Sequence, residues 1–267
     1  MTRSSCVPGT VLWLCVAFTA PAEARGQALT TKLDAYIASA AGTLDPRARA
    51  VLGKIPSRSR RLLAVAHYVQ RQHLVDERWP WSGPESAAYQ RTEEYRQRME
   101  EIRRVKRTFD SLNPGYRLVA GTGGRSLTTQ IAYWNREGSV AAAARELLQG
   151  CLVRLANPTF PATPDSAGLA LFLDNLVAYE TARLPTVAVP GLSMHGRFRA
   201  IDFAVMRGNR IVAGTSSASI QTVWDGGGWT DRLREAVTQA RGTFAGPLEE
   251  PREPWHYEYQ TWTAAAR

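Results

Sequence analysis

Apolar residues recur at helical spacing through residues 29–112. Positions 62, 66, 69 and 73 form one stripe, and positions 95, 99, 102, 109 and 112 form another. Such steps of three and four residues are typical of helices that bury one face. The segment 79–84 (WPWSGP) interrupts the pattern and predicts a turn or loop. We expect a hairpin of helices that pack on each other or on the C-terminal part of the chain; the alternative is an arm that binds a partner.

The pattern changes after Asn113-Pro114-Gly115, which predicts a break in the chain. Beyond it the sequence predicts helices at 127–134, 139–155, 167–183 and 230–241. Short strands are predicted at 116–120, 199–205, 211–213 and 255–262, with a hairpin turn at 207–210. This order favours an α+β fold, in which helices surround a small antiparallel sheet and a helical segment precedes it.

The N-terminus has the features of an export signal. Arg3 precedes a ten-residue apolar run at 11–20, and Ala22-Glu23-Ala24 supplies an A-x-A cleavage site. We therefore predict a signal peptide at 1–24, a helical N-terminal region at 25–112 and a second domain at 113–267. The protein is expected in the periplasm or cell envelope with no stable membrane span after cleavage. The alternative is an uncleaved anchor, for which the run is short.

Charge and cysteine content narrow the function classes. The net charge of +9 comes almost wholly from arginine, because only three of the 33 basic residues are lysine. A basic protein can attract polyanions, but export argues against nucleic acid as the partner. Cleavage would leave Cys151 as the one cysteine, which excludes an intramolecular disulfide and favours a buried, unreactive side chain.

The candidate chemistry lies in the histidines. His67 and His73 fall in or beside the first apolar stripe, which favours structural roles. His195 instead follows a Pro-Gly turn, and Asp202 comes seven residues later on a predicted strand. With His256 they would give three ligands, which leaves one position of a tetrahedral zinc for water. Glu253, three residues before His256, is the candidate general base for that water. The alternative is that these residues are ordinary polar surface.

Three separate blocks resemble one family. The chain carries Ser193-x-His195, then Ala200-x-Asp202, and finally Glu253-Pro254-Trp255-His256. This order is similar to the S-x-H-x-x-G-x-A-x-D and E-P-W-H motifs of VanY-type zinc D-alanyl-D-alanine carboxypeptidases. An upstream segment, 120–130, resembles that family's S-G-Y-R-S…Q block. The resemblance covers 116–267, excludes the helical prefix, and implies the Hedgehog/DD-peptidase fold.

Carried over by position, the resemblance makes His195, Asp202 and His256 ligands of Zn²⁺ and Glu253 the catalytic base. It also implies that Arg125 stabilises the oxyanion of the substrate, and that Ser193 and Gln130 hold the substrate. Two positions depart from the pattern. Phe198 replaces a glycine, so either the turn differs or Phe198 narrows the cleft, and Gly124 replaces a tyrosine, which removes an aromatic wall.

The resemblance therefore implies an exported zinc peptidase that hydrolyses peptidoglycan stem peptides, with the terminal D-Ala-D-Ala bond as the expected target. Three alternatives stay open: an endopeptidase of the same fold, a non-catalytic cell-wall binding module, and a helical scaffold acting through 29–112. The scissile bond, the oligomeric state and the role of the prefix do not follow from the sequence.

Overall fold

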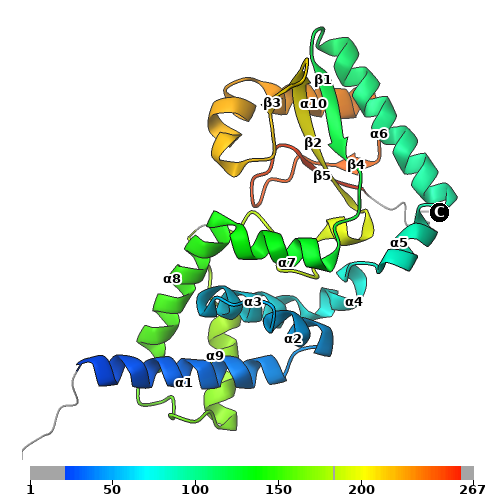
Figure 1. Cartoon of the computed structure of the whole chain (residues 1–267). Helices are drawn as coiled ribbons and strands as arrows, with labels where there is room; N and C mark the ends of the chain where they lie inside the picture. Colours follow the sequence, from blue (N-terminus) through cyan, green and yellow to red (C-terminus); the bar gives the residue numbers. More distant parts are fainter. Residues whose placement is uncertain (1–21, 183, 260–267) are drawn as a thin grey trace, which may run out of the picture.

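The computed structural model describes residues 22–182 and 184–259 as an α+β protein with a small antiparallel sheet (Figure 1). Its first part is helical, as expected. The helices are α1 (Ala22–Gly42), α2 (Pro46–Leu52), α3 (Arg58–Arg71), the 3-10 turn η1 (Gln72–Leu74), α4 (Val75–Arg78), α5 (Gly83–Tyr89) and α6 (Glu93–Leu112). The predicted interruption lies at the end of α4. There Ser82 and Glu85 form a reciprocal cap that starts α5.

Strands and helices alternate irregularly in the second part. The strands are β1 (Arg117–Gly121), β2 (Ala200–Arg207), β3 (Arg210–Ala213), β4 (Phe244–Ala245) and β5 (His256–Tyr259). The helices are α7 (Leu127–Arg136), α8 (Gly138–Leu155), α9 (Ser166–Val177) and α10 (Trp229–Gln239), and the short turns are η2 (Met194–Arg197), η3 (Ser217–Ser219) and the π-helix η4 (Ile220–Asp225). The sheet order is β1-β2-β5-β4, and β3 pairs with β2 through the predicted hairpin.

One hydrophobic cluster is built mainly from helices. It unites α1, α2 and α3 with α7, α8 and α9, and we call these six helices the helical lobe. Helix α3 is its centre, because Leu62, Leu63, Val65 and Tyr68 are all buried. Cys151 of α8 is buried in this cluster, as predicted, and burial raises the pKa of its thiol to about 11.

A second cluster lies between the sheet and two helices, and we call it the sheet lobe. Ile201, Phe203 and Val205 point from β2 into this core, where α6 and α10 cover them (Figure 1). Helix α6 contributes Ile102, Val105 and Phe109 at helical spacing. The other face of β2, which carries Ala200 and Asp202, is left for the site.

The two clusters cut across the expected division at residue 112. Helix α6 precedes that boundary and packs on the sheet, while α7, α8 and α9 follow it and pack on α1 and α3. The division into 25–112 and 113–267 stays a prediction.

Several element predictions need correction. His73 is exposed in η1 and does not continue the stripe of α3, and Leu112 at the end of α6 is 39% exposed. Helix α9 ends at Val177, well before 183, and β4 and η4 were not predicted. The predicted strand at 255–262 is β5 as far as Tyr259, and the rest lies outside the described residues.

The predicted signal peptide lies mostly outside the described residues. Residues 1–21, with most of the predicted signal, are not described, and Ala22-Glu23-Ala24 begins α1. Export therefore stays a prediction. Among the helices of the described residues, none combines the length and the hydrophobicity of a membrane span.

Candidate metal centre

Pairing between β2 and β5 builds the centre. Asp202 and His256 are directly opposite each other in the antiparallel register. Opposite residues of two such strands project from the same face, so the side chains must meet. His256 Nδ1 lies 3.0 Å from Asp202 Oδ1. The alternation predicted for this strand is confirmed, because Ile201 and Phe203 fill the core on the opposite face.

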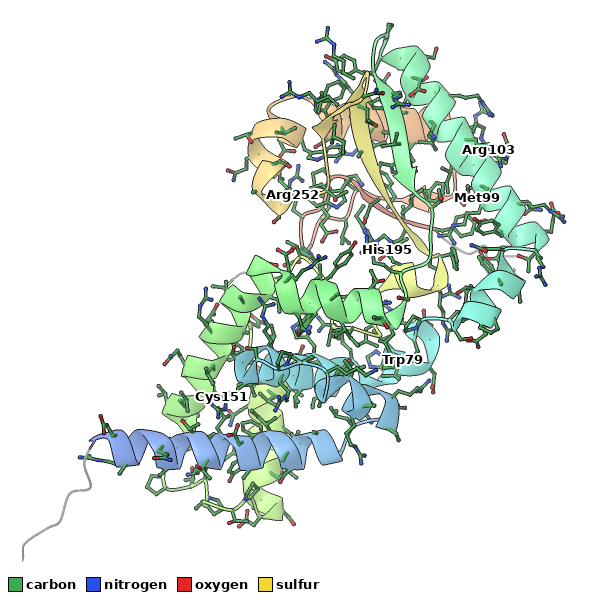
Figure 2. The ribbon with its side chains drawn as sticks, viewed as in Figure 1. Trp79, Met99, Arg103, Cys151, His195 and Arg252 are labelled. Carbon is green, nitrogen blue, oxygen red and sulfur yellow. The ribbon has the colours of Figure 1, made fainter. Side chains whose placement is uncertain are left out.

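The third member comes from the turn before β2. The Pro190-Gly191 turn leads into η2, where the His195 side chain is buried and its Nε2 lies 3.3 Å from Asp202 Oδ1. A hydrogen bond from the backbone N–H of Arg125 to the backbone carbonyl of His195, at 2.9 Å, fixes η2 beside the end of β1. Figure 2 shows His195 at the junction of the two lobes.

Together these three side chains could hold a metal ion. One donor atom from each of His195, Asp202 and His256 lies within 4.8 Å of the other two. Two imidazole nitrogens and a carboxylate oxygen, all largely buried, are a donor set that suits zinc and related divalent ions. His256 is further oriented by Glu258, whose Oε1 lies 3.6 Å from its second ring nitrogen, as a supporting carboxylate does at many metal sites.

Burial and mutual charge shift the protonation of this cluster. Burial alone would raise the pKa of Asp202, but hydrogen bonds from His195 and His256 and the charge of Arg125 outweigh it and hold that pKa well below its ordinary value. Burial opposes charge on His256, but Asp202 and Glu258 raise its pKa to about 9. Burial lowers the pKa of His195. The ionised Asp202 carboxylate therefore favours a protonated His256, and a cation bound to these groups would displace that proton.

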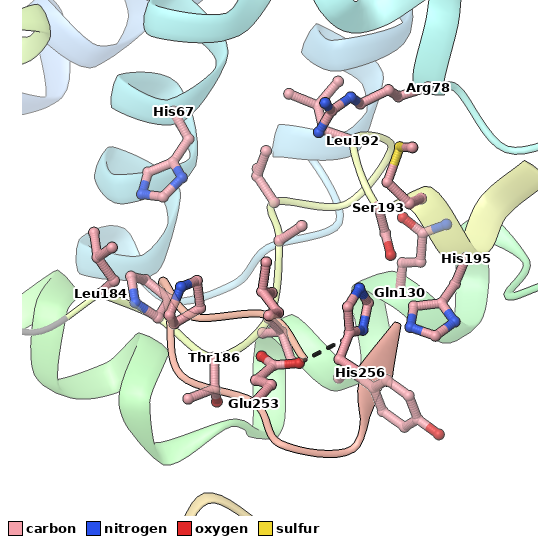
Figure 3. Close-up of a pocket in the computed structure, with 18 of the residues that line it drawn as sticks. His67, Arg78, Gln130, Leu184, Thr186, Leu192, Ser193, His195, Glu253 and His256 are labelled. Carbon is pink, nitrogen blue, oxygen red and sulfur yellow. Dashed lines mark ion pairs between the residues drawn. The ribbon is translucent and has the colours of Figure 1, made fainter. Parts of the chain in front are cut away.

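Glu253 stands beside the three ligands without completing them. It is 7% exposed, and its Oε2 lies 3.7 Å from His256 Nδ1 (Figure 3). Burial is the main cause that raises its pKa to about 7. A carboxyl group with such a pKa can both take and return a proton near neutral pH.

Arg125 contacts one of the three candidate ligands directly. Its Nη2 donates to Asp202 Oδ2 at 2.5 Å, and its guanidinium lies 5.3 Å from the ring centre of Tyr133. It still lines the cavity next to the centre. This contact uses one nitrogen of the guanidinium, so its other N–H groups can still donate to a substrate carbonyl, and the oxyanion role stays a prediction.

The two predicted substrate-holding residues differ in their contacts. Ser193 precedes η2 and lines the cavity, where its hydroxyl makes no cap hydrogen bond. Gln130 is buried: its Nε2 donates to the Arg125 carbonyl at 2.9 Å and its Oε1 accepts from the Gly191 N–H at 2.8 Å. These bonds give Gln130 a positioning role for the two loops, and contact with substrate stays a prediction for both residues.

A cavity of about 270 Å³ opens on the centre (Figure 3). Ligand pockets span about 300–1,000 Å³, so this one suits a small ligand or the end of a chain. Neither Gly124 nor Phe198 lines it. Sequence reasoning missed Tyr133, which lies three residues after Gln130 on α7, and Glu258, two residues after His256 on the same strand face. It also missed a group from the helical lobe and α4: His67, Arg71 and Arg78.

Comparison with known proteins adds no assignment, since no protein-family model, curated protein or solved structure matches the chain.

Proposed function

We propose that the protein is an exported zinc peptidase of the VanY type that hydrolyses peptidoglycan stem peptides, with the terminal D-Ala-D-Ala bond as its target. The observation that carries the proposal is the buried His195, Asp202 and His256 group with Glu253 beside it. Three ligands and a separate carboxyl group are the composition of a hydrolytic zinc centre, whereas a structural zinc has four protein ligands. The Hedgehog/DD-peptidase fold belongs to the same proposal, which rests on the motif order and the antiparallel sheet.

The chemistry divides among the residues around the cavity. Zinc, when bound, would polarise the scissile carbonyl and acidify a water molecule. Glu253 takes one proton from that water through its carboxylate as the water oxygen attacks the carbonyl carbon. It returns the proton to the amide nitrogen as the C–N bond breaks, so that one water yields one carboxylic acid and one amine. The N–H groups of Arg125 that do not contact Asp202 would stabilise the carbonyl oxygen as its negative charge develops.

The size of the cavity favours a carboxypeptidase over an endopeptidase. A space of about 270 Å³ suits the last residues of a peptide better than a chain that continues on both sides. The reaction therefore releases a terminal D-alanine and leaves a shortened stem.

Incubation of the zinc-loaded protein with purified muropeptides, followed by mass spectrometry, tests the proposal. Loss of one alanine per stem is the expected result, and Glu253→Gln at equal zinc content is the matched control. Internal stem fragments would identify an endopeptidase. No product at any zinc concentration would contradict the peptidase proposal and favour a non-catalytic wall-binding module.

A further inference from the structure

One wall of the cavity comes from the chain N-terminal to the motifs. His67 and Arg71 of α3 and Arg78 of α4 line the same space as Ser193, His195 and Glu253. In Figure 3, Arg78 lies on the side of Leu192 and Ser193, and His67 projects from α3 toward Leu184. The region that bears no resemblance to the zinc motifs therefore contributes two guanidinium groups to the space beside them.

Arg78 has an unused donor. Its Nε is buried, and within the described residues it has no hydrogen-bond partner. A buried donor without an acceptor is destabilising, and more so on a charged group, so such groups usually meet a ligand or water. The donor lies in a side chain that lines the cavity, where an acceptor from a ligand would satisfy it.

The charges of the two arginines are not neutralised by direct pairing. Arg71 contacts neutral groups, with its Nη1 3.1 Å from His67 Nδ1 and 3.3 Å from Gln70 Oε1. Among the described residues, neither Arg71 nor Arg78 has a carboxylate oxygen within 4 Å. Burial, and after it the charge of Arg78, lowers the pKa of Arg71, so the two like charges act on each other. The charge of Arg78 helps to lower the pKa of Glu258, but the Glu258 carboxylate already pairs with His256.

The position of Arg78 is fixed relative to His195. Arg197 of η2 donates from Nε to the Trp79 carbonyl at 2.8 Å and from Nη2 to the Asp76 carbonyl at 2.7 Å. Gly191 lies so close to Trp79 that a Cβ would be 2.3 Å from the indole ring, and its φ of +95° also favours glycine. These contacts hold the end of α4 against the turn that carries His195, so the arginine is positioned before any ligand arrives.

We propose that Arg78, supported by Arg71, binds the free carboxylate of the substrate's terminal residue, so that the helical segment before the motifs selects peptides that end in an acid. The inference rests on the proposed peptidase function. A guanidinium offers parallel N–H donors that match a carboxylate, and such charge-assisted bonds are the strong ones. This subsite gives the helical prefix a part in the chemistry, although the resemblance to the zinc family does not extend to it.

The test compares two probes that differ only in charge: diacetyl-L-Lys-D-Ala-D-Ala and its C-terminal amide. Wild-type protein should cleave the acid about 10 to 100 times more efficiently, as expected for one charge-assisted hydrogen bond. Arg78→Gln should lose that factor for the acid, mainly through KM, and change the amide little, while Arg78→Lys should recover part of the preference. Arg58→Gln removes an exposed ion pair with Asp34 in the helical lobe and should behave as wild type. Melting temperature and zinc content verify that the variants are folded.

An equal loss for both probes in folded Arg78→Gln, or no loss for either, would overturn the subsite. If wild-type protein cleaves neither probe, the peptidase proposal fails, and binding of the same probes measured by calorimetry decides about the subsite separately. Tighter binding of the acid that disappears in Arg78→Gln would still support it. Equal binding of acid and amide, or no binding of either, would contradict it.

Discussion

The ring of Phe198 occupies the space that a side chain at position 124 would need. A Cβ built on Gly124 would lie 2.7 Å from Phe198 Cε2, closer than real contacts allow. Phe198 itself has φ +57°, in the left-handed region that favours glycine, and its ring packs on Trp81, Tyr89 and Tyr95. The two departures from the carboxypeptidase pattern are therefore coupled: the Phe198 ring fills the space that the absence of a side chain at Gly124 leaves open. Phe198 lies in a left-handed turn and does not line the cavity beside the metal centre, so its ring does not narrow that cavity.

This coupling predicts non-additive stability. Gly124→Ala should destabilise the fold by roughly 1–3 kcal/mol because the methyl group strikes the ring. Phe198→Gly should cost about 3 kcal/mol, because lost burial exceeds the relief of the left-handed backbone. The destabilisation of the double variant should be smaller than the sum of the two single effects by at least about 0.5 kcal/mol, because the methyl group at 124 no longer meets a ring. Urea unfolding of the four proteins measures this, and strict additivity would contradict the coupling.

Glu253 and Asp202 should behave differently when changed. Glu253→Gln keeps shape and hydrogen bonding but cannot accept a proton, so zinc should stay bound while turnover falls by about 10² to 10⁴-fold. Asp202→Ala, His195→Ala and His256→Ala should lose metal and activity together. Elemental analysis beside muropeptide turnover separates the two classes. Full zinc in His195→Ala and His256→Ala would refute the ligand assignment, and zinc loss in Glu253→Gln would make Glu253 a ligand.

Arg125→Ala should keep zinc and lose about 10² to 10³-fold in turnover, the usual effect of a missing oxyanion donor. Its present contact with Asp202 adds a second expectation. Without that guanidinium the pKa of Asp202 should rise, because the Arg125 charge helps to lower it. Steady-state kinetics and zinc titration test both points. Wild-type turnover in Arg125→Ala would show that the arginine serves only to hold Asp202.

His67 should make the fold sensitive to acid. Burial, then the nearby Arg71, lowers its pKa from 6.5 to about 3. Its contribution to stability is complete above pH 6.5. Below that pH the unfolded chain takes up a proton that the folded chain refuses, so stability falls by about 1.4 kcal/mol per pH unit as pH approaches 3.

His67→Gln should remove that slope, and exposed His73→Gln should retain it. Free energies of unfolding measured by urea between pH 7 and pH 4 decide the matter. A wild-type slope in His67→Gln would show that another group causes the acid loss. Because His67 lines the cavity, its replacement also tests whether α3 contributes to turnover.

The sequence was most informative where chemistry depends on neighbouring positions. The alternation of apolar residues predicts that Asp202 faces away from the core of its strand. The four-residue motif at 253–256 predicts that Glu253 lies beside His256. Burial of Cys151 followed from its helical surroundings. In each case, the deciding contacts lie within a strand, a turn or a helix.

The remainder depended on contacts between distant segments. Nothing near Arg78 in the sequence indicates that α4 would be held against η2, because that contact needs Arg197, more than one hundred positions later. The apolar stripe of α6 predicted burial but not its partner, the sheet. The apolar stripe of α3 stops before His73, because the helix ends at Arg71 and the chain tightens into the 3-10 turn η1, a change that residue spacing does not show.

The crossing of the two clusters has a consequence for synthesis. The helical cluster draws on residues from Leu33 to Leu192, and the sheet cluster on residues from Ile102 to Tyr257. During synthesis the helical cluster therefore cannot be completed until Leu192 has been made. By then α6 is complete, but the strands β2 and β5 of its own cluster have not yet been made. The two cores overlap along the chain, so neither core can be complete before synthesis of the other has begun.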